Sequence, residues 1–177
     1  MLGRLKFRHG VHPPELKELT ARVPIRRLPF PDEVVLPLRQ HAGKPARPVV
    51  RVGDRVERGD TIGEADGFVS TPLHASAAGR IEEIGLWPHP DGSYAPAVRI
   101  AVDPSSPHAA RARLVPEWSS LAPAELIEAI RQAGVVGLGG AAFPTHVKLS
   151  PPKDVTIDTI LINGCECEPY LTSDHRT

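Results

Sequence analysis

Three glycines within four residues form the strongest chemical signal in this sequence. Residues 137–144 read Gly-Leu-Gly-Gly-Ala-Ala-Phe-Pro, and Lys148 follows shortly after. Glycines let a backbone approach a ligand closely and present its N–H groups to an anion. The N-terminal dipole of a nearby helix and the lysine cation would strengthen that attraction. The stretch therefore predicts a phosphate-binding loop, and a glycine-rich turn without a ligand is the alternative.

An acidic turn forms the second group. Residues 163–169 read Asn-Gly-Cys-Glu-Cys-Glu-Pro and follow the apolar run 156–162, which predicts a strand. Open α/β sheets place ligands at the C-terminal ends of their strands. The amide of Asn163 and the carboxylates of Glu166 and Glu168 are therefore candidates for the other side of a cofactor pocket. The alternative for the two glutamates is a solvated turn.

The cysteines and histidines predict neither a metal site nor a catalytic site. Cys165 and Cys167 have a C-x-C spacing that does not match the usual zinc or iron–sulfur pairs. We interpret them as small residues in a turn, and His9 and His12 as surface or turn residues. No acid–base dyad or nucleophile is evident, so we predict no catalytic residue.

The elements that position these groups fall into a β-rich part and a shorter helical part. A helix is expected from Pro123, with Ser120 as its N-cap, to Ala133-Gly134, and a short helix is expected over 145–149. Before them, short apolar runs separated by turn residues predict strands at 34–36, 47–52, 61–65, 68–71, 73–75, 79–84 and 97–102.

Composition excludes several classes of function. The 177 residues include 21 basic and 21 acidic ones, so a zero net charge gives no case for nucleic-acid binding. No apolar run reaches the roughly 18 residues of a membrane-spanning helix, and no secretory signal is present. The default compartment is the cytoplasm, with any membrane attachment made through partners.

Residues 34–103 resemble the barrel-sandwich fold of lipoyl and biotinyl carrier domains. The match rests on Val-Gly-Asp-Arg-Val-Glu-Arg-Gly-Asp at 52–60 and on Ala-Ser-Ala-Ala-Gly-Arg-Ile at 75–81. Carrier domains hold a modifiable lysine at a hairpin tip, where this chain has Asp-Gly-Phe at 66–68. No lysine lies between Lys44 and Lys148. We therefore expect a structural or docking module rather than a swinging arm.

The glycine stretch resembles the flavin-binding loop of the NADH-oxidising subunit of respiratory complex I. It is closer still to the C subunit of the Rnf (Rsx) electron-transport complex. That family also fits Gly-Val-His-Pro-Pro-Glu at 10–15, Pro-Leu-Arg-Gln-His-Ala-Gly-Lys-Pro at 37–45, and Glu-Cys-Glu-Pro-Tyr-Leu-Thr-Ser-Asp-His-Arg at 166–176. The resemblance runs in order over nearly the whole chain.

The resemblance implies a mixed α+β chain of four parts. An N-terminal arm (1–33) would precede an all-β barrel-sandwich hybrid (34–103), a linker (104–120) and the incomplete start of an α/β FMN- and NADH-binding domain (121–177). A chain that stops there looks truncated, since a nucleotide-binding sheet needs more strands. We expect the apolar residues Ile160, Leu161 and Ile162 to be partly uncovered and FMN binding by the isolated chain to be weak or absent.

The resemblance also implies a function. Hydride exchange between NADH and FMN would be followed by release of single electrons to iron–sulfur clusters. Ferredoxin would be the redox partner, and other Rnf subunits would couple the reaction to ion movement. The [4Fe-4S] clusters would belong to a missing C-terminal part, and the protein would lie peripherally on the cytoplasmic side of the bacterial inner membrane. The alternatives are a docking or assembly module with an inactive flavin site, and a cobalamin-reductase flavoprotein of bacterial microcompartments.

The resemblance to complex I also implies cofactor-binding residues, at the positions of this chain that match the complex I motifs. In complex I the glycine loop wraps the flavin, the lysine contacts its phosphate, the aromatic stacks on the nucleotide, and the acidic turn contacts both. Cys165 departs from the pattern because complex I subunits have Asp there. The residues implied for FMN and NADH are Gly137, Leu138, Gly139, Gly140, Ala141, Phe143, Lys148, Asn163, Glu166 and Glu168.

Overall fold

The computed structural model divides the chain into two compact units, one of residues 28–156 and one of residues 1–27 with 157–177. It describes residues 11, 13–107, 109, 117–152, 154–164, 166 and 168–176, and the side chains of 175 and 176 are not among the described parts. The predictions for His9, His12, Cys165 and Cys167 lie outside the described residues.

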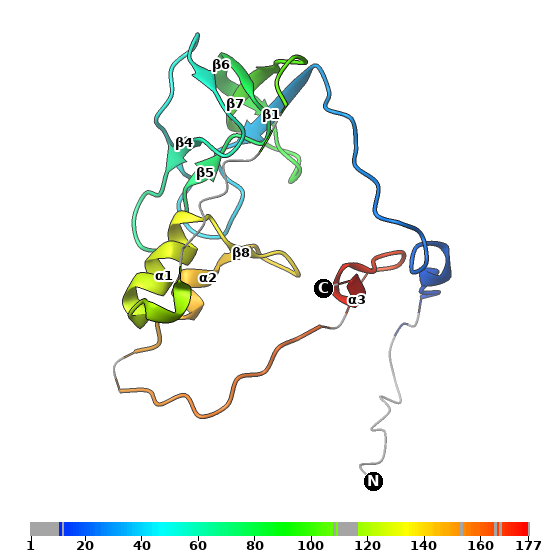
Figure 1. Ribbon diagram of the computed structural model, residues 1–177, viewed down its shortest axis with the longest axis vertical. Coiled ribbons are helices and arrows are strands. Elements are labelled where there is room, and N and C mark those ends of the chain that lie inside the picture. Colours follow the sequence, from blue (N-terminus) through cyan, green and yellow to red (C-terminus); the bar gives the residue numbers. More distant parts are fainter. Residues whose placement is uncertain are drawn as a thin grey trace. The chain divides into compact units, whose positions relative to one another are not determined.

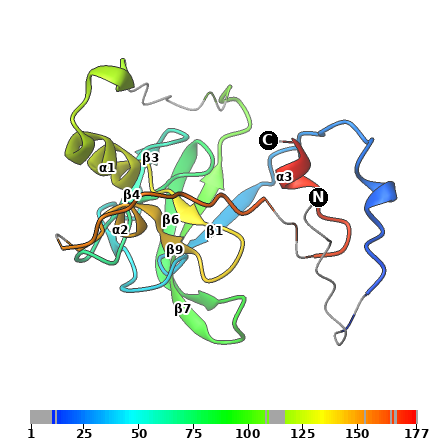
Figure 2. The same ribbon diagram turned by 90° about the horizontal axis from the view of Figure 1, so that it is seen from below.

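The larger unit is built on two small antiparallel sheets (Figure 1). One sheet has the order β1 (Glu33–Pro37), β7 (Tyr94–Val102), β6 (Gly79–Pro88) and β3 (Arg55–Val56). The other has the order β2 (Arg47–Pro48), β4 (Thr61–Glu64) and β5 (Leu73–His74). Figure 2 shows the β6–β7 hairpin reaching beyond the shorter strands that flank it.

The core of this unit comes from alternating apolar residues on the long strands. Ile81 and Ile100 are cross-strand partners, and both are fully buried, as are Val98 and Ile62. Successive side chains of a strand point to opposite faces, so Val98 and Ile100 lie on the inward face of β7. The β-rich organisation expected for residues 34–103 is confirmed.

Helices gather beyond the β4 and β5 end of this unit (Figure 1). They are the 3₁₀ turn η2 (Trp118–Ser120), α1 (Pro123–Gln132) and α2 (Thr145–Lys148), with the two-stranded hairpin β8 (Val136–Gly137) and β9 (Phe143–Pro144) between the helices. The smaller unit contains the 3₁₀ turn η1 (Lys17–Leu19) and α3 (Ser173–Arg176).

The start of α1 at Pro123 is confirmed, but the predicted N-cap is wrong. Ser120 belongs to η2, and its Oγ donates a hydrogen bond to the carbonyl of Glu117 at 2.8 Å. The N-cap is Ala122, and its amide donates to Glu125 Oε2 at 2.8 Å. The serine hydroxyl is already bonded within the preceding 3₁₀ turn. The carboxylate of Glu125, in the first turn of α1, therefore accepts the backbone hydrogen bond at the start of the helix instead.

Two predicted strands do not form. Residues 156–162 run as an extended segment without a strand partner among the described residues, and Figure 1 draws them as a plain tube. Residues 68–71 form bends, and Gly67 has the positive φ of 99° that a turn here requires. The expected exposure is confirmed, since Ile160, Leu161 and Ile162 are 80%, 91% and 92% exposed.

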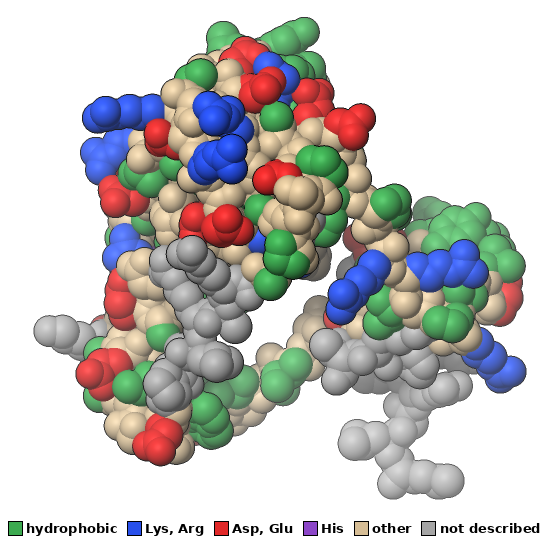
Figure 3. Space-filling view, turned by 45° about the horizontal axis from the view of Figure 1, so that its top comes forward, with side chains coloured by type: hydrophobic (Ala, Val, Ile, Leu, Met, Phe, Trp, Pro, Cys, Tyr) green, Lys and Arg blue, Asp and Glu red, His purple; other side chains and the backbone are tan. Residues whose placement is uncertain are grey.

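The face of the molecule in view in Figure 3 carries both signs of charge. Figure 3 shows Lys and Arg interspersed with Asp and Glu on the face in view, in keeping with the zero net charge. Within the described part of the chain, none of the helices has the length and apolar character needed to cross a bilayer.

Candidate functional site

The glycine loop is the tip of the β8–β9 hairpin. Val136 pairs with Pro144 and Gly137 with Phe143, so residues 138–142 form the turn between them. Ala142 closes this turn in a left-handed conformation, with φ 50°. The amide of Thr145 then donates to the carbonyl of Val135 at 3.0 Å, which starts α2 directly behind the loop. Local hydrogen bonds therefore fix the loop against the helix that follows it.

Lys148 lies against this loop. A Cβ atom added to Gly137 would collide with the Lys148 ammonium, so this ammonium lies directly beside the Gly137 backbone. A Cβ added to Gly139 or Gly140 would meet no other atom within 4 Å, and Leu138 is 87% exposed. A cation beside accessible glycine backbone fits a phosphate group, because both supply donors to its oxygens.

The acidic turn belongs to the smaller unit and is tied to the N-terminal arm. The ammonium of Lys17 donates to the carbonyl of Glu168 at 3.1 Å and to that of Leu171 at 2.8 Å. It also lies 3.5 Å from Glu166 Oε2. In turn, Glu166 Oε1 accepts from the amide of Asp174 at 2.8 Å, at the start of α3. Nothing in the sequence pattern pointed to Lys17.

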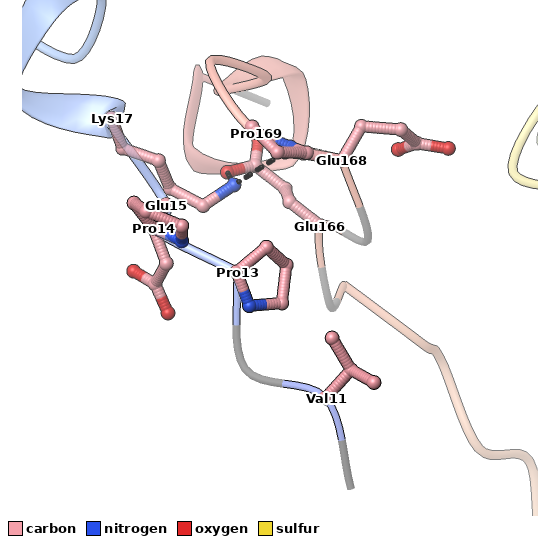
Figure 4. Close-up of a pocket in the computed structure, with 8 residues that line it drawn as sticks. All are labelled: Val11, Pro13, Pro14, Glu15, Lys17, Glu166, Glu168 and Pro169. Atoms are coloured by element: carbon pink, nitrogen blue, oxygen red, sulfur yellow. Dashed lines mark hydrogen bonds and ion pairs between the residues drawn. The ribbon is translucent and has the colours of Figure 1, made fainter.

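Glu166 and Glu168 play different parts in this turn. The Glu166 side chain is only 9% exposed and its two oxygens face Lys17 and the Asp174 amide, so it holds the turn together. Glu168 contributes its backbone carbonyl, while its exposed carboxylate points away from Lys17 (Figure 4). Asn163 is exposed as well. The carboxylate of Glu168 is therefore the one available to a ligand.

A pocket of about 200 Å³ opens beside this turn within the smaller unit (Figure 4). Its apolar lining comes mainly from the arm, and its charged lining comes from Glu15 and Lys17 of the arm and from the two glutamates of the turn. Its lining comprises Val11, Pro13, Pro14, Glu15, Lys17, Glu166, Glu168 and Pro169.

The predicted site residues thus fall into two groups. Residues 137–148 lie in the unit of 28–156, whereas residues 163–168 lie in the other unit. The first group is Gly137, Leu138, Gly139, Gly140, Ala141, Phe143 and Lys148, and the second is Asn163, Glu166 and Glu168.

His146 is a second residue whose role the sequence did not reveal. It is 2% exposed on α2, and its Nε2 lies 2.7 Å from the carbonyl of Phe68. Its burial and this contact indicate a structural role. The contact joins residues 78 positions apart, and no local pattern encodes such a distant pair.

Comparisons with known proteins identify both parts of the chain. Residues 5–105 match the model of the RnfC barrel sandwich hybrid domain, and residues 130–177 match that of the Nuo51 FMN-binding domain. The predicted fold class, a barrel-sandwich hybrid followed by the start of a flavin-binding domain, is confirmed.

Curated relatives match almost the whole chain. It is 45% identical to the C subunit of the "proton-translocating ferredoxin:NAD(+) oxidoreductase complex" of Clostridium ljungdahlii, covering 97% of this chain and 37% of the relative. It is 41% identical to the "Na(+)-translocating" counterpart of Acetobacterium woodii, covering 96% of this chain and 38% of the relative. The C subunit of an "ion-translocating oxidoreductase complex" of Pseudomonas aeruginosa is 42% identical, with 95% of this chain and 22% of the relative covered.

The chain thus spans less than two fifths of the length of these curated relatives. The barrel-sandwich model alone covers more than half of its residues, and the predicted resemblance is confirmed. On these grounds the chain belongs to the RnfC family, the C subunits of ion-translocating oxidoreductase complexes.

Proposed function

We propose that this chain supplies the phosphate-binding side of an FMN site in an electron-transport subunit. The observation that carries the proposal is the placement of the Lys148 ammonium against Gly137, beside exposed glycine backbone. The match of residues 130–177 to an FMN-binding domain supports the same cofactor.

The chain's own residues would bind and orient the cofactor. Lys148 would pair with the phosphate, and the loop at Gly139 and Gly140 would let the ribityl chain approach the backbone. In the unit of residues 28–156, Phe143 would stack on a nicotinamide nucleotide. In the other unit, the exposed Glu168 and Asn163 would offer hydrogen-bond acceptors to a ligand. When bound, FMN would supply hydride acceptance from NADH and one-electron release.

The names of the relatives indicate the kind of complex in which this chemistry would take place. Two of them belong to ferredoxin:NAD(+) oxidoreductase complexes, so we propose that the complex passes electrons between ferredoxin and the nicotinamide nucleotide. Other subunits would carry the ion across the membrane. We further propose iron–sulfur clusters outside this chain and a peripheral position on the cytoplasmic face of the inner membrane.

A second candidate is an assembly module that binds no flavin. The state of Glu166 favours it, because both carboxylate oxygens already have partners in the protein. In that case the barrel-sandwich would dock other subunits, and the glycine loop would be a structural turn.

A comparison of FMN with riboflavin distinguishes the two functions. Riboflavin lacks the phosphate, so a phosphate site makes FMN bind more tightly, by roughly tenfold or more for a charge-assisted pair worth about 1.5–3 kcal/mol. The Lys148→Ala variant should lose this preference, while Arg55→Ala, which removes an exposed cation from β3, should keep it.

The measurement is a flavin-fluorescence titration of the chain and of any longer product that contains it. No difference between FMN and riboflavin in either protein would sink the phosphate site and leave the assembly module. Weak binding by the chain alone, with tight binding by the longer product, is the result expected from the share of the relatives that it covers.

A further inference from the structure

The tip segment, defined as residues 66–70, lies where carrier domains hold their modifiable lysine. Although Phe68 is 60% exposed, the backbone of this segment contacts the helices that flank the glycine loop. The carbonyl of Phe68 accepts from His146 Nε2 at 2.7 Å, and the carbonyl of Gly67 accepts from the guanidinium of Arg131 at 3.0 Å. Two successive carbonyls of one tip are thus bound by α1 and α2.

The barrel-sandwich holds the tip segment firmly from its other side. Ser70 is fully buried, and its Oγ accepts from the amide of Asp66 at 3.0 Å and donates to the carbonyl of Lys44 at 2.9 Å. The amide of Lys44 donates to the carbonyl of Val69 at 3.1 Å. Gly43 approaches so closely that an added Cβ would collide with the same carbonyl. The tip segment is therefore a fixed part of the barrel rather than a mobile arm.

The hydrogen bond from His146 has a defined direction. A carbonyl only accepts, so Nε2 carries the proton. The ring also meets the Phe68 ring edge-on, with 5.7 Å between the centroids, and Nδ1 is buried without a partner among the described residues. Breaking this bond would leave a buried donor unsatisfied, which costs more than the bond itself contributes. The contact therefore fixes the position of α2 strongly.

Helix α2 also carries Lys148. It has only four residues, Thr145–Lys148, too few to be stable without tertiary contacts. The contacts of its two ends are local, since Thr145 is bonded to Val135 and Leu149 to Thr145. Helix α2 also contacts α1, but His146 provides its hydrogen bond to the barrel, and the ammonium two residues further on faces Gly137.

We propose that the tip segment positions the Lys148 ammonium through His146, so that His146 is a positioning residue for the phosphate site. This inference rests on the proposed function for its consequence, and its structural part stands without a flavin. The barrel-sandwich then contributes to cofactor binding from a distance, through two backbone carbonyls.

Two amide variants of His146 test the hydrogen bond itself. In His146→Gln the amide nitrogen lies the same number of bonds from Cβ as Nε2 and can donate to Phe68. In His146→Asn the amide reaches only the position of Nδ1 and cannot. Both variants remove the imidazole and keep a polar amide. The main difference between them is therefore whether the side chain can donate to the Phe68 carbonyl.

The first readout is hydrogen exchange of the flavin-free chain. The amides of Leu149 and Ser150, bonded to Thr145 and Val147, report on α2. We expect exchange to rise about tenfold in the Asn variant and to stay within about threefold of the parent in the Gln variant. The amides of β6 and β7 should not change in either. Equal behaviour of the two variants would overturn the proposal.

Gly43→Ala provides an independent route if the Asn variant fails to fold. It displaces the Val69 carbonyl from the barrel side and leaves α2 untouched in sequence. The same rise at Leu149 and Ser150 is expected, and an unchanged rate in a folded Gly43→Ala protein would contradict the proposal.

The second readout is the preference for FMN over riboflavin. His146→Asn should reduce it about as much as Lys148→Ala, with riboflavin binding unchanged, and His146→Gln should restore it. If neither the parent chain nor a longer product that contains it shows a preference, the proposed function fails, while the exchange data still decide whether the tip segment holds α2. A preference retained in His146→Asn would overturn the positioning role.

Discussion

At the scale of single residues, ion pairs and hydrogen bonds determine which side chains are available to a ligand, and residue type alone does not. Glu166 and Glu168 are neighbours of the same kind in the same turn. One is held by Lys17 and the Asp174 amide, and the other presents an exposed carboxylate. A sequence pattern cannot separate them, because the separation comes from a lysine about 150 positions away. Their different surroundings, and not their shared chemistry, decide which of them can face a ligand.

Asp91 makes the stability of the β6–β7 turn dependent on pH. Hydrogen bonds from the Ser93 hydroxyl at 2.6 Å and amide at 3.0 Å lower the pKa of this carboxyl well below its ordinary value of 3.8. Arg39 and His89 lower the pKa further. A depressed pKa stabilises the fold above the unfolded-state pKa, and this contribution is lost as the pH falls below about 4.

We therefore expect Asp91→Asn to flatten the loss of stability between about pH 5 and pH 3. The urea midpoint of the parent should fall over this range by more than that of the variant, and the variant should be the less stable protein at pH 6. Asp158→Asn, which changes an exposed carboxyl elsewhere, serves as control. Parallel pH profiles for the parent and Asp91→Asn would refute this role.

At the scale of elements, the sequence predicted what depends on local pattern. Alternating apolar residues placed the strands around Ile81 and Ile100, and Pro123 and Gly134 marked the ends of α1. The run 156–162 failed because a strand also needs a partner, which the described residues do not supply. The contacts of the tip segment depend on residues of α1 and α2, so no pattern within it could predict them.

The link between the arm and the acidic turn is a testable element contact. Lys17→Ala removes the donor to two carbonyls and the cation beside Glu166, whose side chain is 9% exposed. We expect the amides of Tyr170 and Asp174, which are bonded to the Glu15 carbonyl and to Glu166, to exchange roughly three to ten times faster.

A double variant distinguishes loss of the ion pair from loss of the carbonyl contacts. Glu166→Gln keeps an acceptor for the Asp174 amide but has no charge to pair with Lys17. If the ion pair matters, the effects of Lys17→Ala and Glu166→Gln will not add. Additive effects would assign the role of Lys17 to the Glu168 and Leu171 carbonyls alone. Unchanged exchange in Lys17→Ala would mean that the arm does not hold the turn.

At the scale of the whole molecule, one part of the chain has a buried apolar core, whereas another part exposes apolar side chains. Residues 28–156 hold the buried core, with Ile62, Ile81, Val98 and Ile100 fully buried. Residues 160–162 instead expose three large apolar side chains on an extended backbone without a strand partner among the described residues. An exposed apolar strand with free hydrogen-bonding edges is a template for pairing with another chain.

We expect the chain to self-associate through this segment, because pairing would bury Ile160 and Ile162 and satisfy the backbone groups between them. The double variant Ile160→Thr with Ile162→Thr keeps the β propensity and removes much of the apolar surface. It should raise the dimer dissociation constant at least about tenfold, measured by sedimentation, since each buried methylene contributes about 0.8 kcal/mol. Val52→Thr, at an exposed position of the barrel, should leave association unchanged. A parent chain that stays monomeric at about 100 µM, equivalent to a free energy of association weaker than about 5.5 kcal/mol, would show that this extended segment does not pair on its own.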